Sequence, residues 1–423
     1  MAVGNVIALS APPRAALYLR PGRLASAQLR DILAAHRRPC DGIVIDPTLW
    51  SRQSDLASLA NSSEVETILD PRSLELASDG GRERTGIAAL PWYTSTLQTP
   101  AYFADAANRH EFVSDIAAFV LERKLTAVLA PTHFTQGDDD PWLGVDDALT
   151  ADLRRILDRR GGENVRLYRP LYIHSSIARR PADVKSIAVR LQGSAADAIW
   201  LGVHPFGSTH AGPLALRRYI ELCLGLHLAG LPLVGVHTGT VGLLLLAMGA
   251  ISGIESGVTD LESFSLAQFQ DMPVRDGRPV IGSTPRVYIQ SLGAFMTKKQ
   301  AQAFYSVRGM TAQHICQMGC CRRGVEDTLT WTINHFVTCR RQEVNRIASA
   351  PTHMRPRLYL DEMLRPASDR AVAASRAVSS LGPIRKRLDD WRQTMAGVLD
   401  QHHGLLPTIS PAVPTGRRST RAS

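Results

Sequence analysis

The chain of 423 residues is poor in lysine: only five of its 48 basic residues are lysine, and the rest are arginine. With 39 acidic residues, the formal net charge is +9. Guanidinium groups pair well with phosphates, so this excess favours nucleic acid as a partner. A GC-rich genome would produce the same arginine bias, and charge alone does not separate the two explanations.

Long apolar runs are also absent. The longest covers residues 241–251, well short of the ~20 residues of a membrane-spanning helix, so we expect no association with a membrane. Residues 1–10 lack the basic region of a secretory signal. The six cysteines are too few and too scattered for a disulfide scaffold. Together these absences predict a cytoplasmic protein, and they leave open whether it forms homo-oligomers.

The sequence does contain a repeated alternation of short apolar runs and helical stretches. Eight runs end at or near a polar residue: 16–20, 42–46, 67–70, 126–131, 166–174, 198–204, 233–237 and 251–255. Eight strands can close a parallel barrel, and a single barrel typically takes ~250 residues. The sequence therefore predicts the α/β class, as a (β/α)8 TIM-type barrel with a C-terminal helical extension.

Three segments are expected from this pattern. Residues 1–282 would form the barrel, and residues 283–366 a Cys/His-containing extension packed on it. Residues 367–423 would form a basic helical tail, disordered at its Pro-, Ser-, Thr- and Arg-rich end. The stretch between residues 70 and 124 is longer than a simple crossover, which favours a lid or an inserted hairpin.

The predicted strand ends form a ring of polar residues. In a parallel barrel all carboxyl ends of strands meet at one mouth, where the chemistry takes place. Four of the chain's 13 histidines fall on these ends. They indicate either solvated turns or a pocket that binds an anion, a base edge or a metal. The ring comprises Arg20, Asp46, Asp70, His133, His174, His204, His237 and Glu255.

Two turns in this ring are candidates for substrate binding. His237 is followed by Gly239, Gly242 and an apolar helix, so backbone amides there could approach a phosphate. Close packing of the helix on its strand would use the same glycines. Phe206 follows His204 and either covers a planar ligand or fills the core.

Carboxylates near the ring are candidates for acid, base or nucleophile. Asp46 and Asp70 each precede a proline, Glu255 ends the eighth run, and Asp260 follows it. Glu262 closes the sequence TDLE, which matches a capping box and predicts a helix-capping role rather than a catalytic one.

The late cysteines form a candidate metal site. Cys316, Cys320 and Cys321 precede a predicted long helix that contains His335 and Cys339. Residues four apart share one face of a helix, so the last two can bind one ion. Two ligands from a loop and two from a helix are typical of structural zinc, and the adjacent Cys320 and Cys321 do not easily serve together, although one of them could. Buried free thiols are the alternative interpretation.

A barrel followed by a Cys-rich loop and a helix with a histidine resembles the tRNA-guanine transglycosylase superfamily. The likeness spans roughly residues 16–347 and rests on Cys316, Cys320 or Cys321, and His335, with the acid at the eighth strand. Members of that superfamily bind zinc through C-x-C-x2-C and a distant histidine, whereas this chain has C-x3-C-C and a nearer one.

The acids differ from the superfamily pattern as well. An aspartate nucleophile is usual near the eighth strand's end, where this chain offers Glu255 with Asp260 nearby. The Asp-Ser-Gly-Gly-Phe motif has no good match, so Asp46 and Asp70 are the candidates for the second acid.

The resemblance implies a pentosyltransferase that exchanges guanine for a 7-deazaguanine base in tRNA or DNA and holds a structural zinc ion. One acid would attack the anomeric carbon and the other would handle protons. Two alternatives remain open. The first is a non-catalytic barrel that binds nucleic acid or a partner protein. The second is a barrel metallohydrolase or an enzyme with a phosphate-bearing ligand, although the first strand has no His-x-His pair.

Overall fold

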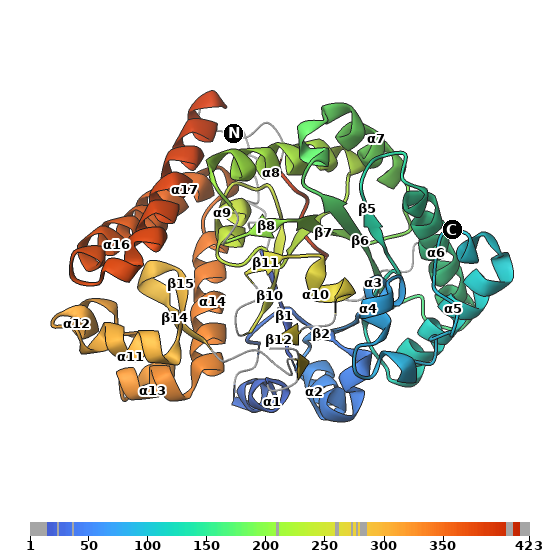
Figure 1. Ribbon diagram of the computed structural model, residues 1–423, viewed down its shortest axis with the longest axis horizontal. Coiled ribbons are helices and arrows are strands. Elements are labelled where there is room, and N and C mark those ends of the chain that lie inside the picture. The colour runs from blue at the N-terminus through green and yellow to red at the C-terminus, as the bar shows by residue number, and fades with distance from the viewer. Residues whose placement is uncertain are drawn as a thin grey trace, which may run out of the picture.

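The computed structural model describes residues 15–402 and 409–414, apart from residues 23–24, 36–37, 209–210, 259–261, 272–273, 276–277 and 280–285. Figure 1 shows a ring of strands enclosed by helices, with a second, helical body at one side. No helix within the described ranges is both long enough and apolar enough to cross a membrane.

Eight parallel strands form a closed barrel, which confirms the predicted fold. Each pairs with the next in chain order, and the last returns to the first, with Ala16 opposite Gly253 and Arg20 opposite Gly257. Every predicted run overlaps one strand. The strands are β1 (Ala16–Arg20), β2 (Gly42–Ile45), β3 (Glu66–Leu69), β4 (Ala127–Leu129), β6 (Arg166–His174), β7 (Ala198–His204), β9 (Leu233–Val236) and β10 (Gly253–Gly257).

Helices cover the outside of the barrel. Several begin with proline at their first position, where no intrahelical donor is needed, and the Asp140 side chain accepts from the Trp142 amide at the start of α6. These helices are α1 (Ser26–Ala35), α2 (Trp50–Ser62), α5 (Ala106–Glu122), α6 (Pro141–Arg159), α7 (Pro181–Leu191), α8 (Pro213–Leu226) and α9 (Val241–Ala247).

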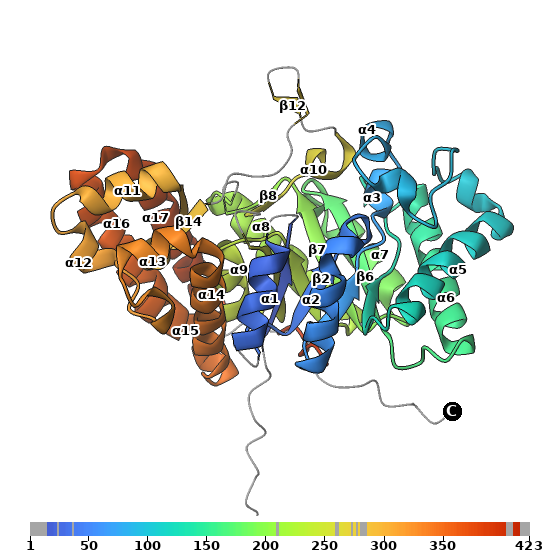
Figure 2. The same ribbon diagram turned by 90° about the horizontal axis from the view of Figure 1, so that it is seen from below.

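The long connection between β3 and β4 contains helical turns rather than a hairpin. Its elements are α3 (Ser73–Leu76), α4 (Asp79–Arg82) and 3-10 turns at Ile87–Ala89 and Tyr102–Ala104. The indole of Trp92 donates to the Pro71 carbonyl at 2.9 Å and fixes the connection to the end of β3. Figure 2 shows α3 and α4 beside α10 (Ala267–Gln270) on one side of the barrel.

Short strands surround the same end of the barrel. β5 (Phe134–Thr135) runs beside the end of β6. β8 (Phe206–Gly207) pairs with β11 (Ser263–Phe264), which leads into α10. A two-stranded hairpin of β12 (Val274–Arg275) and β13 (Arg278–Pro279) follows. The capping box expected around Glu262 therefore leads into a strand and not into a helix.

The C-terminal extension begins with the hairpin β14 (Arg286–Ile289) and β15 (Ala294–Thr297). In both ribbon views α14 lies between the barrel and the outer helices. One buried core runs continuously from the barrel helices through the extension. The other elements are α11 (Lys298–Ser306), α12 (Met310–His314), α13 (Val325–Thr330), α14 (Thr332–Ala348), α15 (Arg355–Leu358), a π-helical turn (Tyr359–Leu364), α16 (Arg365–Ala377) and α17 (Gly382–Gln401).

The interior of the barrel is filled by aromatic rings and is closed at the amino ends of its strands by residues 409–414. Trp200 packs on Tyr18 and Tyr168, with ring centroids 4.9 and 5.5 Å away. Residues 409–414 lie at the amino ends of the strands, where Val413 joins this cluster. Ser410 accepts from the Leu233 amide through its hydroxyl at 2.9 Å. This segment falls within the stretch expected to be disordered, and the rest of that stretch lies outside the described residues.

Candidate functional site

A buried arginine links the first and last strands at the mouth. Arg20 ends β1, and its Nε donates to Glu255 of β10 at 2.7 Å. Its Nη1 donates to Asp70, just after β3, at 2.5 Å. The side chain of Glu255 is fully buried, and those of Arg20 and Asp70 are 11% exposed. The single guanidinium group of Arg20 thus bridges the carboxylates of Asp70 and Glu255.

Both carboxylates are held in the ionised form. Burial alone would raise the pKa of Glu255, but the charges of His237 and Arg20 outweigh it and lower the pKa to about 2. Burial also opposes ionisation of Asp70, yet Arg20 and Arg72 lower its pKa. An ionised carboxylate can act as a nucleophile or as a base, and not as a proton donor.

His237 completes this cluster in a strained conformation. Its φ is +50°, which is uncommon for a residue other than glycine and often marks a functional site. Its amide donates to Glu255 at 3.1 Å, and its Nε2 lies 3.3 Å from the same carboxylate. The ring is therefore held against the acid that ends β10.

The second candidate acid, Asp46, has a different setting from Asp70. Its carboxylate accepts from the Thr48 amide at 3.0 Å and so caps the 3-10 turn Pro47–Leu49. Its other oxygen lies 3.6 Å from Arg72, which also pairs with Glu75 at 2.6 Å. Asp46 is thus engaged in a local turn, whereas Asp70 shares Arg20 with Glu255.

The turn after β9, where the sequence favours an anion site, is occupied by a carboxylate of the chain itself. Glu262 accepts from the Thr240 amide at 3.1 Å, at the start of α9. A Cβ on Gly239, whose φ is +62°, would lie 2.6 Å from the Glu262 carboxyl carbon. A Cβ on Gly242 would lie 2.4 Å from the Thr238 hydroxyl. Glycine at 239 thus makes room for Glu262, and any phosphate there would have to replace it.

A short segment covers the mouth. We call residues 263–271, which include β11 and α10, the covering segment. Its Phe269 stacks near His237 and Tyr172, at centroid distances of 6.0 and 6.5 Å. Phe264 stacks on Tyr172 at 5.2 Å. The free space left beside Asp70 and Phe269 is about 10 Å³, too little for a substrate.

The covering segment is fastened at several points. His204 accepts from the Leu266 amide through Nδ1 at 3.1 Å. Arg84 donates to the Gln268 carbonyl at 2.6 Å. His174, opposite His204 in the strand register, is bonded through Nδ1 to the Ser176 hydroxyl at 2.8 Å. Both histidines therefore lie at the mouth, as expected from their positions at strand ends.

Two other predicted binding residues pack into the core. His133 is buried, stacks on Trp142 with centroids 3.7 Å apart, and is bonded to Asp146 through Nδ1 at 2.6 Å. Phe206 stacks on Tyr219 of α8 at 4.0 Å. In this conformation neither contacts the acids of the mouth. Asp260, another predicted catalytic residue, lies outside the described residues.

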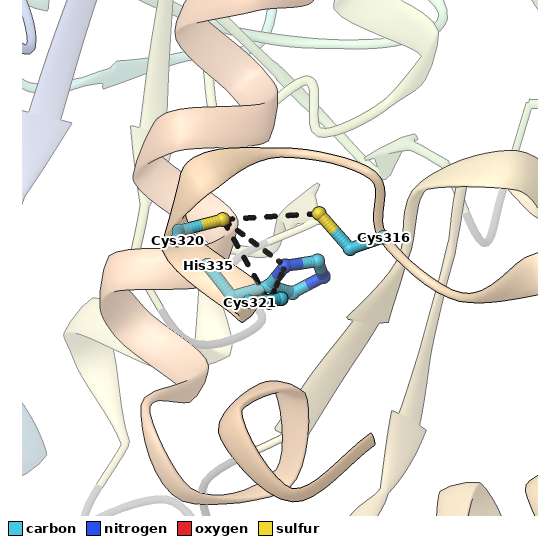
Figure 3. A group of neighbouring side chains, drawn as sticks. All are labelled: Cys316, Cys320, Cys321 and His335. Atoms are coloured by element: carbon cyan, nitrogen blue, oxygen red, sulfur yellow. Dashed lines mark hydrogen bonds between the residues drawn. The ribbon is translucent and has the colours of Figure 1, made fainter. Parts of the chain in front are cut away.

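The predicted metal ligands come together in the extension. Cys316, Cys320, Cys321 and His335 each offer an atom within 4.8 Å of all the others (Figure 3). The sulfur of Cys320 lies 3.8 Å from that of Cys316 and 3.7 Å from that of Cys321. Thiolates at about 2.3 Å from a tetrahedral zinc ion are about 3.8 Å apart. The cluster could therefore hold a metal ion.

The ligand set differs from the expected one in the elements that supply the ligands. The loop supplies three groups and α14 supplies one, and the adjacent Cys320 and Cys321 both belong to the cluster. A 3-10 turn over Gly319–Cys321 lets the two side chains converge. Cys339 lies beside the cluster, 3.6 Å from Nδ1 of His335 and 4.0 Å from the Cys316 sulfur.

The surroundings of the cluster suit a bound cation. Nε2 of His335 is bonded to the Tyr288 carbonyl at 2.8 Å, so it carries the proton and leaves Nδ1 free to bind a metal. The Met318 amide donates to Cys316 at 3.3 Å, and the Thr328 hydroxyl donates to Cys321 at 3.2 Å. Hydrogen bonds from the neighbouring thiols lower the pKa of Cys316, which favours ionisation of this thiol to the thiolate that binds a metal.

Several residues of the mouth were not singled out from the sequence as site residues. Arg20 was visible only as one member of the polar ring, although its pairing with two acids organises the mouth. Tyr172 and Phe269 gave no signal, because an aromatic residue in a strand or loop usually belongs to the core. Arg72 follows Asp70-Pro71, and that acidic turn was its only marker.

Fold and site together define a (β/α)8 barrel with paired buried acids at its mouth and a Cys/His cluster in its extension. No family model matches the chain, and no curated protein matches it. Among solved structures, it is similar to orotidine 5'-monophosphate decarboxylase from Methanocaldococcus jannaschii, with 12% identity and a TM-score of 0.35 over 59% of this chain and 91% of that one.

Two further structures show a comparable likeness. An HpcH/HpaI aldolase from Desulfitobacterium hafniense has 11% identity and a TM-score of 0.32 over 58% of this chain and 86% of that one. The carboxyl transferase domain of Rhizobium etli pyruvate carboxylase has 13% identity and a TM-score of 0.36 over 94% of this chain and 59% of that one. Such distant likenesses say nothing about activity, and the barrel is defined by its own strand register.

Proposed function

We propose that the protein is a pentosyltransferase that exchanges a base of tRNA or DNA at the barrel mouth. The observation that carries the proposal is the bridge of Arg20 between Asp70 and Glu255. Two carboxylates on either side of a reacting anomeric carbon are the usual arrangement for cleavage of a glycosidic bond. The resemblance to the transglycosylase superfamily and the net charge of +9 point to nucleic acid as the substrate.

The roles of the two acids follow from their settings. Glu255 is the nucleophile, because it stays ionised and is held by His237 and Arg20. An oxygen of Glu255 bonds to C1′ while the bond from C1′ to the base breaks, and the electron pair leaves with the base. Asp70 first takes up a proton from water once Arg20 has left it, and then gives that proton to the departing base. It then takes a proton from the incoming base, which attacks C1′ and releases Glu255.

This sequence of steps requires Arg20 to leave Asp70. The guanidinium holds Asp70 ionised when no substrate is bound, and a proton donor must be protonated. The covering segment must also move, because Phe269 and Phe264 fill the mouth. Entry of a base between these rings would break the contact of Arg20 with Asp70, leave its contact with Glu255 in place, and open the site at the same time.

Zinc is the ion that we assign to the Cys/His cluster. Three thiolates and one imidazole at tetrahedral spacings are typical of structural zinc, and four protein ligands leave no position open for substrate. Within the described residues no comparable group of His, Cys, Asp or Glu gathers at the mouth, so a barrel metallohydrolase is less well supported. The zinc would join the loop of residues 315–321 to α14.

The test is a covalent adduct between the protein and a nucleic acid. The full chain is incubated with tRNA or duplex DNA, quenched in denaturant and analysed by gel and mass spectrometry. An adduct at Glu255 is expected, and Glu255→Gln should abolish it, whereas Glu122→Gln, a change of an exposed glutamate on α5, should not. A melting curve of each variant separates loss of chemistry from loss of fold.

Two outcomes would contradict the proposal. If Glu255→Gln folds and still forms the adduct, Glu255 is not the nucleophile. If the native chain binds nucleic acid in a salt-sensitive manner and neither forms an adduct nor exchanges a labelled guanine, the barrel is a binding module.

A further inference from the structure

A cavity lies in the extension, away from the barrel mouth, and the metal-ligand candidates Cys316 and His335 are among the residues that line it. It has a volume of about 410 Å³, within the range of small-ligand pockets. We call it the extension pocket. In both ribbon views α12 and α16, which contribute to its walls, lie on the far side of α14 from the barrel. The residues that matter here are Gln290, Gln313, His314, Gln317, Gln342 and Arg370.

Four of these residues are glutamines. An amide offers both a donor and an acceptor, and a pair of them matches the donor and acceptor edge of a nucleobase. Gln313 and Gln317 are exposed, and within the described part of the chain neither side-chain amide forms a hydrogen bond. Gln290 donates to Gln342 at 3.0 Å, so these two are already oriented along one wall.

A buried imidazole adds a further polar group. His314 is only 3% exposed and is bonded through Nδ1 to the Ser291 hydroxyl at 2.8 Å. Its Nε2 is buried and has no hydrogen-bond partner among the described residues. A buried polar atom without a partner is costly, so a ligand that bonds to it would remove that cost.

Charged groups at the rim complete the site. Arg346 and Arg370 line the pocket, and both are exposed at its edge. Arg346 pairs with Glu362 at 2.8 Å, whereas Arg370 belongs to α16 on another side. Glu343 and Glu362 also line the pocket, so Arg370 is the guanidinium that suits a phosphate outside, with the glutamine amides facing a base inside.

We propose that the extension pocket binds one unstacked nucleotide, with the base against the glutamines and the phosphate near Arg370. This inference rests on the proposed function for the origin of the ligand, since a strand that reaches the mouth can offer a second nucleotide. A free nucleoside monophosphate has the same chemistry. The pocket would then select substrates by sequence without taking part in the reaction.

The experiment measures binding of fluorescent single-stranded RNA and DNA oligonucleotides to the full chain by anisotropy, with free nucleoside monophosphates as competitors. The double variant Gln313→Ala/Gln317→Ala should bind about tenfold more weakly, with an unchanged salt dependence, because no charge is removed. Arg370→Gln should lower the salt slope by about one. Gln302→Ala, an exposed glutamine on α11 outside the pocket, is the matched control.

The results separate the ligand sources and the two proposals. Competition by a free monophosphate that disappears in the double variant supports the pocket with a free nucleotide as ligand. Equal affinity of the double variant and the native chain overturns the pocket, even where the adduct at Glu255 forms. Weaker binding by the double variant supports the pocket, even where no adduct forms and the proposed function fails.

Discussion

Nε of Arg20 lies 2.7 Å from the carboxylate of Glu255, across the seam where the first and last strands of the barrel pair. The ion pair is thus both a part of the candidate site and a link in the closure of the barrel. Replacing one partner of a buried pair leaves the other charge without compensation.

Arg20→Met should therefore be strongly destabilising. We expect a loss of about 3–5 kcal/mol in the free energy of unfolding, measured by urea denaturation at neutral pH. Arg323→Met removes an arginine that is 59% exposed and also paired with acids, and should cost less than about 1 kcal/mol. Equal losses in the two variants would mean that the buried ion pairs of Arg20 contribute no more to the free energy of unfolding than exposed ones do.

The covering segment should control access to the acids. Phe269→Ala removes the ring that stacks near His237 and Tyr172, so Asp70 should react faster with a carbodiimide and an amine nucleophile, as followed by peptide mass spectrometry. Phe295→Ala, in β15 of the extension, should leave that rate unchanged. An unaltered rate for Phe269→Ala would show that another group closes the mouth.

Glu262 should stabilise the turn before α9. Its carboxylate accepts from the Thr240 amide and lies 3.9 Å from the buried Arg340. Glu262→Ala removes both contacts and should lower the free energy of unfolding by about 1–3 kcal/mol. Glu262→Gln keeps an acceptor for the amide and should lose less. The order of the two melting temperatures tests this contact, and a reversed order would contradict it.

Metal content distinguishes the ligands from their neighbours. We expect about one zinc ion per chain by mass spectrometry of the metal, and Cys321→Ser should lose it. Cys223→Ser, far from the cluster in α8, should retain it. Cys339→Ser should also retain it, because Cys339 lies beside the four groups rather than among them. Loss in Cys339→Ser with retention in Cys321→Ser would reassign the site.

A buried acid at the base of the barrel should make stability depend on pH. Burial raises the pKa of Glu66 to about 7, from an ordinary value of 4.5. As pH rises from 4.5 to 7 the unfolded chain releases this proton before the folded chain does, so stability falls in that window by up to about 3 kcal/mol. Glu75 has the same direction of shift, also to about 7.

Glu66→Gln should therefore reduce the difference in stability between pH 5 and pH 8. Adding Glu75→Gln should reduce this difference further. Urea unfolding at the two pH values gives the comparison, with Glu122→Gln as the exposed control. If the native chain loses less stability between pH 5 and pH 8 than the variants do, the sign is reversed and the assignment is refuted.

The barrel could be predicted from the sequence because its signal is local. Each strand is a short apolar run that ends at a polar residue, as at Asp70 and His174, and eight such runs leave few alternatives. The Cys/His cluster was also foreseen, since all its members lie within 20 residues of one another. The joint use of Cys320 and Cys321 was not, because it depends on a tight turn at Gly319.

The roles of the polar ring depend on partners that lie far away in the chain. His133 looks like His204 in the sequence, yet its ring is bonded to Asp146 of α6, while the ring of His204 accepts from the Leu266 amide. Glu262 had the local pattern of a helix cap, and it does bind the start of a helix, but that helix lies 22 positions earlier. Sequence spacing does not show which distant element supplies a partner.

The segment at residues 409–414 gives the molecule an order of assembly. Its Ser410 bonds to the amino end of β9, and the hydroxyl of Ser252, just before β10, bonds to the Ser410 carbonyl at 3.1 Å. These residues leave the ribosome after every strand of the barrel. A nascent chain can therefore pair its strands before it has residues 409–414, which cover the amino ends of those strands. Truncation before residue 409 should leave these strand ends exposed to other chains.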